Sequence, residues 1–299
     1  MDTESVKRTS QLGNRVSTVL GRKLGRELLR LRIAAGKTQQ QAGDVINATN
    51  SKLVKMESGW VPMRDPDIRI LCESYGVNDP KVVGWLLELA RLDRERRKAK
   101  GWWISTTTPT TPVEYLYLED AAYGIRQWQM ALIPGLFQTP EYLRALGTAE
   151  VTWDDMDRMD DVVATRMKRQ ERLHSADPLQ IHAVVWEAAL RQQMGGPEVM
   201  KQQLARLCEV VELPNVRLQV LPFEAGRHPC IGGPFSILSF GEDEALDLAY
   251  VETPRSLIWI ENAEEGASFA NLFDRTAEAS LSPRESARFI DNVRKETSK

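Results

Sequence analysis

Apolar side chains recur at helical spacing near the start of the chain. Four leucines follow one another every three or four residues: Leu20, Leu24, Leu28 and Leu31. This spacing places them on one face of an amphipathic helix. Thr18 stands before the pattern as a capping residue, and Gly36 stands after it, where glycine is favoured just past a helix end. The pattern predicts a helix between these two residues.

Four more helix starts follow within residues 38–80. Each begins with a short oxygen-bearing side chain that can cap a helix, and in the last two a proline stands next: Thr38, Thr49, Asp65-Pro66 and Asp79-Pro80. The helix after Pro66 would turn four side chains inward and stop at Gly76: Ile68, Leu71, Cys72 and Tyr75. We expect a flexible basic arm over 1–17 and a compact all-α domain of five helices over 18–100.

The pattern changes after residue 100. Residues 104–113 are rich in Thr and Pro, cannot continue a helix, and predict a linker over 101–113. Helical stretches follow near 152–174, 197–212, 263–280 and 284–296. Short β-like runs lie between them at 180–186, 216–222, 235–240, 246–252 and 257–260. Helices and strands interleave irregularly, so we expect a larger α+β domain over 114–299.

The charge of the chain is unevenly distributed. Residues 1–100 hold 20 Lys and Arg against 12 Asp and Glu, about +8, and residues 101–299 hold 19 against 30, about −11. A basic head on an acidic body indicates that only the head meets a polyanion. The cysteines, scattered at Cys72, Cys208 and Cys230, favour a reducing cytoplasm over a disulfide framework.

Residues 38–59 meet the demands of two short helices joined by a tight turn. Gly43 stands where the helices would touch, and Asn47 is the best choice after glycine for a turn residue with positive φ. Five apolar residues fall on the inner side: Ala42, Ile46, Ala48, Leu53 and Met56. The same pattern also fits a polar helical hairpin whose outer face is merely solvated.

The outer side of the second helix carries groups suited to reading base edges. Asn50 can pair bidentately with adenine, Lys52 and Lys55 with guanine, and Ser51 with either kind of edge. Val54 can contact a thymine methyl group. Gln39, at the start of the first motif helix, is placed to contact a phosphate. Further positive charge lies nearby at Arg15, Arg22, Lys23 and Arg26.

Three strings resemble the phage-repressor (XRE-type) helix-turn-helix family over about residues 18–90. They are Leu24-Gly25-Arg26-Glu27-Leu28, Gly36-Lys37-Thr38-Gln39 and Met56-Glu57-Ser58-Gly59. The resemblance implies that Gln39 touches phosphate and that Thr49, Asn50, Ser51, Val54 and Lys55 read bases. Asn47 departs from the usual turn glycine, and Ala42 and Ala48 replace bulkier residues.

A second resemblance covers about residues 115–285. The string from Ala131 to Tyr142, followed by Arg166-Met167-Lys168-Arg169-Gln170 and Trp186-Glu187-Ala188-Ala189-Leu190-Arg191, is similar to an uncharacterised domain of actinomycete helix-turn-helix regulators. Some of these are described as antitoxin-like and paired with a small protein encoded nearby. Around Pro134-Gly135 the chain bends sharply, which is compatible with a pocket wall or with a packing corner. The residues of this candidate partner or effector region are Ile133, Pro134, Gly135, Leu136, Gln138 and Tyr142.

The sequence therefore predicts a cytoplasmic, homodimeric regulator bound to near-palindromic double-stranded DNA. No apolar run approaches the roughly 18–20 residues of a membrane span, and the polar start does not resemble a secretory signal. An enzyme is the less favoured alternative, because metal-binding and nucleophile motifs are incomplete at His228-Pro229-Cys230 and Gly266-Ala267-Ser268-Phe269-Ala270. We expect no catalytic residue, metal or cofactor. A helix-turn-helix that grips a protein instead of DNA is the other alternative.

Overall fold

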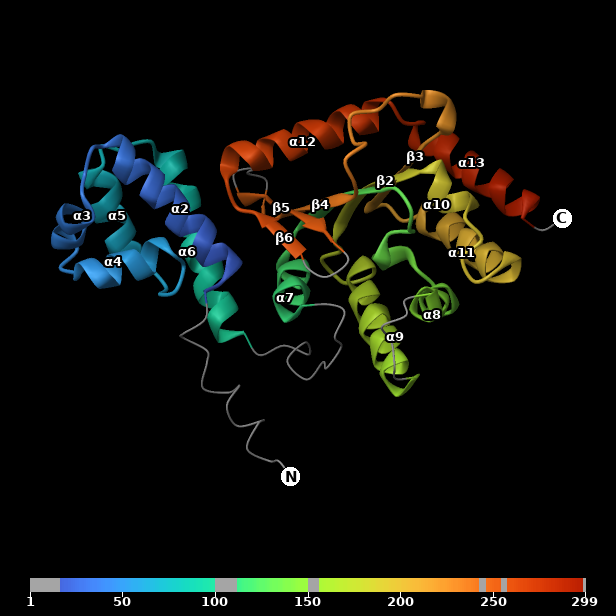
Figure 1. Ribbon diagram of the computed structural model, residues 1–299, viewed down its shortest axis with the longest axis horizontal. Helices are drawn as coiled ribbons and strands as arrows, with labels where there is room; N and C mark the ends of the chain where they lie inside the picture. The colour runs from blue at the N-terminus through green and yellow to red at the C-terminus, as the bar shows by residue number, and fades with distance from the viewer. Residues whose placement is uncertain (1–16, 100–111, 150–155, 242–245, 254–256, 298–299) are drawn as a thin grey trace. The chain divides into compact units, whose positions relative to one another are not determined.

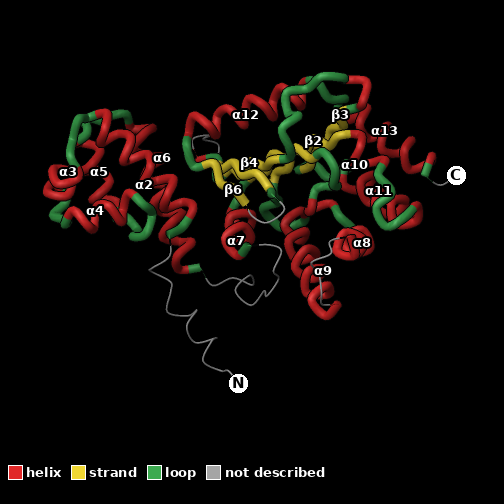
Figure 2. Tube along the Cα trace, in the orientation of Figure 1, coloured by secondary structure: helices red, strands yellow, loops and turns green. Residues whose placement is uncertain are grey.

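The chain forms two compact units. A computed structural model describes residues 17–99, 112–149, 156–241, 246–253 and 257–297. The first unit is Met1–Gly101 with Glu261–Glu265, and the second is Trp102–Ile260 with Gly266–Lys299. Apart from Ser17, the expected basic arm falls outside the described residues, and so does the expected linker through residue 111. Val113, which the linker was expected to include, already belongs to a helix. Figure 2 shows helices and loops in the first unit, while the described strands lie in the second.

The first unit contains five described helices, as expected (Figure 1). They are α2 (Val19–Ala34), α3 (Gln39–Val45), α4 (Asn50–Glu57), α5 (Asp65–Ser74) and α6 (Pro80–Lys98). We refer to α2–α6 as the helical domain. Its core consists of apolar side chains spaced along these helices, which include Leu20, Leu24, Leu28, Leu53, Ile68, Leu71 and Leu86. Burial of these side chains supplies most of the stability of so small a domain, because short helices are marginal alone.

Most of the predicted helix ends are confirmed. Thr18, Thr38, Thr49 and Asp79 are N-caps whose side chains accept a backbone N–H of the first turn. Gly36 and Gly76 have φ of 65° and 76° directly after α2 and α5. The start of α5 was predicted one residue too late. Arg64 is its N-cap, Asp65 is already helical, and the Asp65 carboxylate forms an ion pair with Arg94.

Close backbone contacts fix how α2 meets the segment that follows α4. A Cβ atom on Gly25 would overlap the carbonyl oxygen of Glu57, and one on Gly59 would lie 2.5 Å from the backbone nitrogen of Arg22. Gly59 also has φ of 72°. Glycine is therefore required at both positions, at Gly59 by backbone conformation and space and at Gly25 by space alone.

The second unit is built on a mixed six-stranded sheet with the order β3-β2-β1-β4-β5-β6. The strands are β1 (Gly124–Gln129), β2 (Gln180–Trp186), β3 (Val216–Leu221), β4 (Phe235–Ser239), β5 (Leu248–Glu252) and β6 (Leu257–Ile260). β1, β2 and β3 run parallel, and β4, β5 and β6 continue the sheet from β1 in antiparallel fashion. The α+β expectation is confirmed, but β1, in the middle of the sheet, was not predicted.

Helices cover both faces of this sheet (Figure 1). They are α7 (Val113–Ala121), α8 (Pro140–Ala149), α9 (Met156–Gln170), α10 (Glu187–Arg191), α11 (Pro197–Val210), α12 (Ala263–Glu278) and α13 (Pro283–Glu296). On one face, Phe273 and Ala277 of α12 pack with Trp128, Val184 and Ile237 in a buried cluster. On the other face, Tyr115 of α7 contacts Tyr250 of β5, with ring centroids 5.2 Å apart.

A buried ionic cluster connects α7 to α9. Glu119 accepts from Arg169 at 2.5 Å and from the Tyr115 hydroxyl at 2.6 Å. Burial alone would raise the pKa of the Glu119 carboxyl, but Arg169, the hydrogen bond from Tyr115 and the charge of Arg166 together outweigh it and lower that pKa. The carboxylate therefore stays ionised, and the pair fixes how α9 meets α7.

Candidate nucleic-acid interface

The helices α3 and α4 form the predicted motif, and the turn between them has the expected geometry. A Cβ atom on Gly43 would lie 2.7 Å from the carbonyl oxygen of Ala48, so the close approach excludes a larger residue. Asn47 has φ of 50° and is the only described non-glycine residue with positive φ. Both residues therefore do in the structure what the sequence pattern assigned to them.

Capping hydrogen bonds fix where each motif helix begins. Thr38 and Gln41 form a reciprocal capping box at the start of α3. The Thr49 hydroxyl accepts the backbone N–H of Lys52 at 3.2 Å at the start of α4. Since the turn is short and both helix starts are capped, the direction of α4 relative to α3 is set locally.

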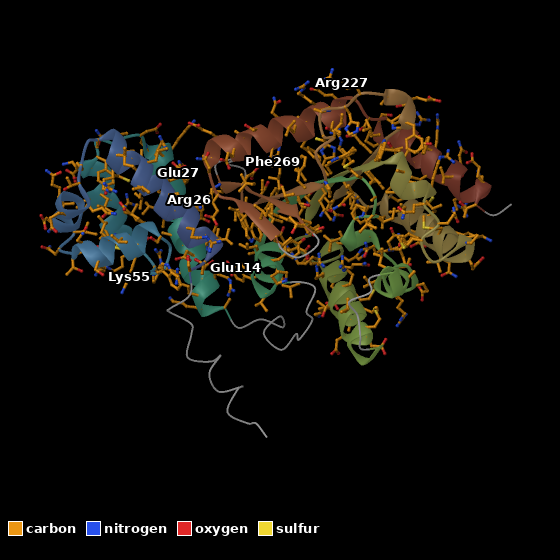
Figure 3. All side chains as sticks on the ribbon, in the orientation of Figure 1. Arg26, Glu27, Lys55, Glu114, Arg227 and Phe269 are labelled. Atoms are coloured by element: carbon orange, nitrogen blue, oxygen red, sulfur yellow. The ribbon has the colours of Figure 1, made fainter. Side chains whose placement is uncertain are left out.

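The two sides of the motif are separated as predicted. The five apolar inner residues are all buried: Ala42, Ile46, Ala48, Leu53 and Met56. The six outer residues of α4 and its cap are all exposed: Thr49, Asn50, Ser51, Lys52, Val54 and Lys55. Figure 3 labels Lys55 at the outer edge of the helical domain. Within the described residues, neither Lys52 nor Lys55 forms an ion pair, so both ammonium groups are available to an anion.

A buried ion pair supports this surface from behind, and sequence reasoning did not predict it. Arg32 donates to Glu57 through Nε at 2.6 Å and through Nη2 at 3.2 Å. Both side chains are less than a tenth exposed. The position of Glu57 on the inner face of α4, one residue after Met56, was the available signal, because a buried carboxylate needs a partner.

Gln39 belongs to the same network. Its carboxamide nitrogen donates to Glu57 Oε2 at 3.0 Å, and the side chain is half-buried. An amide nitrogen carries two hydrogens, so the second can still donate to a phosphate oxygen. The Gln41 N–H is capped by the Thr38 hydroxyl, but the backbone N–H groups before it have no intrahelical acceptor and point out of the N-terminal end of α3. The side chain of Gln39 is thus held in place by Glu57 at the N-terminal end of α3, where the helix dipole favours an anion.

The positive charge around the motif differs from the sequence expectation. Lys23 is only 3% exposed, so it cannot meet DNA, and Arg15 lies outside the described residues. Trp60, three residues after the end of α4, is 49% exposed and was not singled out. Its indole N–H is a donor, so this ring is a further candidate for a contact next to the motif.

The candidate effector region of the second unit is largely packed against its own chain. Ile133, Leu136, Gln138 and Tyr142 are each at most 3% exposed. The Gln138 amide donates to the Ile133 carbonyl at 2.8 Å, and the Ile133 N–H donates to the Tyr142 hydroxyl at 3.3 Å. Pro134 leads directly into a 3₁₀ turn at Gly135–Phe137. This geometry favours the packing corner over the pocket wall.

The residues considered for catalysis lie within a helix or take part in packing and hydrogen bonds of the second unit. Ser268 lies inside helix α12 and not at a turn between strand and helix. His182 is hydrogen-bonded to Gln219 at 2.7 Å, and His228 is buried against Trp128 and Trp186. No group of three or more His, Cys, Asp or Glu side chains among the described residues could hold a metal ion. No helix in the described parts of the chain is long and apolar enough to cross a membrane.

Comparison with known families agrees with this geometry. A model described as a helix-turn-helix domain matches residues 23–86, which identifies the helical domain as one of that class and suggests a DNA-binding regulator. A model described as a domain of unknown function (DUF5753) matches residues 113–292. The chain belongs to the family that this domain defines. No curated protein and no solved structure matches the chain.

Proposed function

We propose that the protein is a sequence-specific transcription regulator that inserts α4 into the DNA major groove. The observation that carries this proposal is the sidedness of α4. Leu53 and Met56 are buried, whereas the polar groups between them and before them are exposed. The apolar side of α4 is packed against the domain, and its exposed side carries amide, hydroxyl and ammonium groups. This is the arrangement that base reading requires.

Each exposed residue of α4 has a distinct role in this proposal. Asn50 pairs with an adenine, Lys55 and Lys52 donate to guanine O6 and N7, and Val54 contacts a thymine methyl group. Ser51 and Thr49 donate to or accept from neighbouring edges. Contacts of this kind specify sequence, while phosphate contacts position the protein.

Gln39 supplies the positioning contact. Its hydrogen bond to Glu57 holds the amide in one direction before DNA arrives, so less side-chain entropy is lost on binding. The N-terminal end of α3 adds backbone N–H groups and the favourable end of the helix dipole. Because a phosphate has no sequence identity, Gln39 should contribute equally at every site.

The test begins with selection of bound duplexes from fragments flanking the protein's own gene. Lys55→Ala should then cost about 1–3 kcal/mol at the selected site and relax preference at one base pair, while Gln39→Ala should weaken all sequences alike. Lys81, an exposed lysine at the start of α6, provides the matched control, and Lys81→Ala should retain operator affinity. If Asn50→Ala and Lys55→Ala both bind the operator as the wild type does, base reading by α4 is refuted.

We further propose that a cytoplasmic homodimer occupies the operator. Two-fold related helix-turn-helix domains contact half-sites about one helical turn, or a multiple of it, apart. The selected operator should then be near-palindromic, and sedimentation should give two chains per operator duplex. One chain per duplex, or an operator without symmetry, would contradict the dimer but not the DNA reading.

For the second unit we propose antitoxin-like control, in which it binds a small protein encoded nearby or a small-molecule effector. The order of motifs through residues 115–285 supports this, as does the acidic balance of the chain beyond residue 100. Co-expression of the full chain with each small open reading frame found beside its gene, followed by native mass spectrometry, separates the options. A stoichiometric second chain supports partner control, whereas a bound metabolite supports sensing. The chain alone in both preparations would oppose this role.

A further inference from the structure

A pocket of about 430 Å³ opens at one end of the sheet, in the second unit. It is formed where the parallel strands β1, β2 and β3 begin, and where β4 ends and β5 begins. Its volume falls within the usual range for small-molecule sites. This pocket lies apart from the Ile133–Tyr142 corner, since no residue of that corner lines it.

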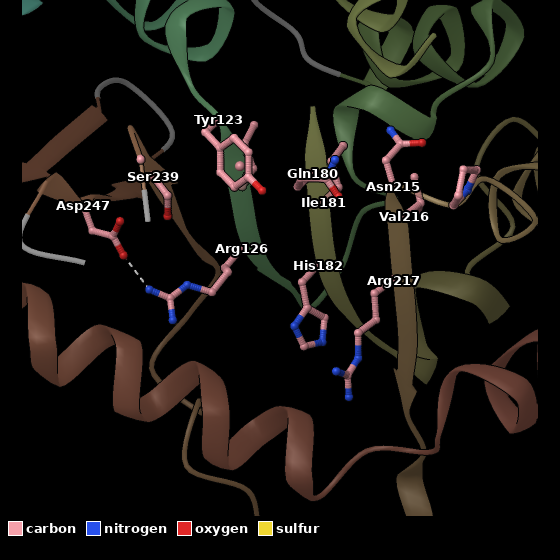
Figure 4. Close-up of a pocket in the computed structure, with 14 residues that line it drawn as sticks. Tyr123, Arg126, Gln180, Ile181, His182, Asn215, Val216, Arg217, Ser239 and Asp247 are labelled. Atoms are coloured by element: carbon pink, nitrogen blue, oxygen red, sulfur yellow. Dashed lines mark hydrogen bonds and ion pairs between the residues drawn. The ribbon is translucent and has the colours of Figure 1, made fainter. Parts of the chain in front are cut away.

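Three basic side chains stand in one row across the pocket. In the sheet register Arg126 of β1 pairs with His182 of β2, and His182 pairs with Arg217 of β3. Residues in register on adjacent strands point to the same face, so the three side chains lie next to one another. Figure 4 shows them side by side, directed toward the same side of the sheet. The row is a feature that only strand pairing creates, because the three residues are far apart in sequence.

The charges of this row are not balanced equally. Arg126 forms an ion pair with Asp247 at 2.5 Å and lies 3.8 Å from Asp274. Arg217 is exposed and has no ion pair or hydrogen bond to any described residue. Its guanidinium therefore presents five N–H donors to the pocket, and no carboxylate of a described residue is paired with it. A planar carboxylate or a phosphate matches this fork.

The tautomer of neutral His182 is fixed by its neighbours. The Gln219 amide nitrogen donates to the carbonyl oxygens of Ala277 and Leu281, so Gln219 Oε1 must be the atom that faces His182 Nε2 at 2.7 Å. Neutral His182 consequently carries its proton on Nε2, and protonation of Nδ1 produces an imidazolium beside Arg217. An anion in the pocket would favour that protonation, which adds a positive charge between Arg126 and Arg217.

We propose that this pocket binds a small organic anion through a carboxylate or phosphate group held by Arg217, with His182 and Arg126 alongside. Tyr123, which also lines the pocket and is 52% exposed, offers a ring face to the rest of the ligand. The site gives the effector branch of the proposed function a location and a ligand class. Binding at the site does not depend on DNA.

The test uses the full chain with its histidines labelled, since His182 is one of three. Citrate and inorganic phosphate are the probes, and they separate carboxylate from phosphate recognition. We expect at least one probe to shift the His182 resonance saturably at millimolar concentration, and Arg217→Gln to weaken that binding by about tenfold or more. Arg227 is an exposed arginine outside the pocket, labelled in Figure 3, and Arg227→Gln should bind as the wild type does.

Two results would overturn the proposal. One is that neither probe moves the His182 resonance, and the other is that Arg217→Gln and Arg227→Gln titrate alike. Operator affinity is measured separately, with and without the probe. Loss of DNA binding in that assay would refute the proposed regulator while leaving the pocket result intact.

Discussion

Arg32, in the last turn of α2, and Glu57, at the end of α4, are joined by an ion pair of 2.6 Å that is shielded from solvent. Arg32 also donates to the Lys37 carbonyl at 2.8 Å, and Glu57 also accepts from Gln39 at 3.0 Å. The pair thus ties the helix before the motif to both motif helices. A contact on the buried side of α4 therefore helps to orient the surface that we propose reads DNA.

Removal of one partner should be costly. Glu57→Ala leaves the Arg32 guanidinium buried without a carboxylate, and we expect the free energy of unfolding to fall by about 3–5 kcal/mol. Glu73 is exposed on α5, so Glu73→Ala should stay within about 0.5 kcal/mol of the wild type. Urea denaturation followed by circular dichroism measures both. Equal stabilities for the two variants would show that the ion pair is not structurally important.

Replacement by alanine should change the stability of the helical domain in opposite directions at two of its glycines, Gly25 and Gly84. A Cβ on Gly25 overlaps the Glu57 carbonyl, so Gly25→Ala should destabilise the domain by about 1–3 kcal/mol. Gly84 is exposed inside α6 with nothing within 4 Å of an added Cβ. Gly84→Ala should stabilise by about 0.5–1 kcal/mol, because alanine loses less backbone freedom in a helix. Thermal unfolding of both variants gives the comparison, and a shift of the same sign in both would contradict it.

The turn residue Asn47 offers a test of backbone conformation. Asn47 has φ of 50°, which a β-branched residue tolerates poorly, so Asn47→Val should cost about 1–2 kcal/mol. Asn47→Gly should be neutral or slightly stabilising. Asn78, an exposed loop residue outside the positive-φ set, is the control, and Asn78→Val should have little effect. The prediction fails if both valine variants melt together.

Acidification should weaken the second unit through two imidazoles, those of half-buried His182 and buried His228. Burial lowers the pKa of His182, and the neighbouring Arg217 and Arg126 lower it further, although Gln219 and Asp274 act in the opposite direction. Burial also lowers the pKa of His228. The unfolded chain therefore takes up protons first as the pH falls through about 6.5, and the free energy of unfolding falls with it until the lowered folded-state pKa values are passed.

The variants for this experiment are His182→Gln and, as control, His174→Gln. His182→Gln should flatten the dependence of unfolding free energy on pH between about 7 and 5. His174 is exposed, so its replacement should retain the wild-type slope. Urea titrations at several pH values measure the slopes. A His182→Gln slope as steep as that of the wild type would place the linkage elsewhere.

Local chemistry accounts for the parts of the fold that the sequence predicted. Capping by Thr18, Thr38, Thr49 and Asp79 depends on residues within one turn, and so does the side that Leu53 and Met56 occupy. The outward face of α4 followed from the same spacing. These features need no knowledge of the rest of the chain.

Features that depend on distant partners were missed. β1 has the sequence Gly-Ile-Arg-Gln-Trp-Gln, and its polar residues are not those expected of a central strand. Gln127 is only 5% exposed and its buried amide nitrogen donates to Ser236, while Arg126 is paired with Asp247. The Arg32–Glu57 pair and the basic row of the pocket likewise join residues from separate elements. Periodicity cannot reveal contacts that tertiary pairing creates.

The position of β1 constrains how the second unit can be made. One edge of this strand is closed by β2, but the other edge is closed by β4, which the chain reaches only after β2, α11 and β3. While a ribosome is still producing those elements, the growing sheet exposes a row of unpaired backbone groups that invites other strands. Any shortened version that ends before β4 would keep that open edge permanently, so we expect a stable second unit only when the residues from β1 through β4 are present in one chain.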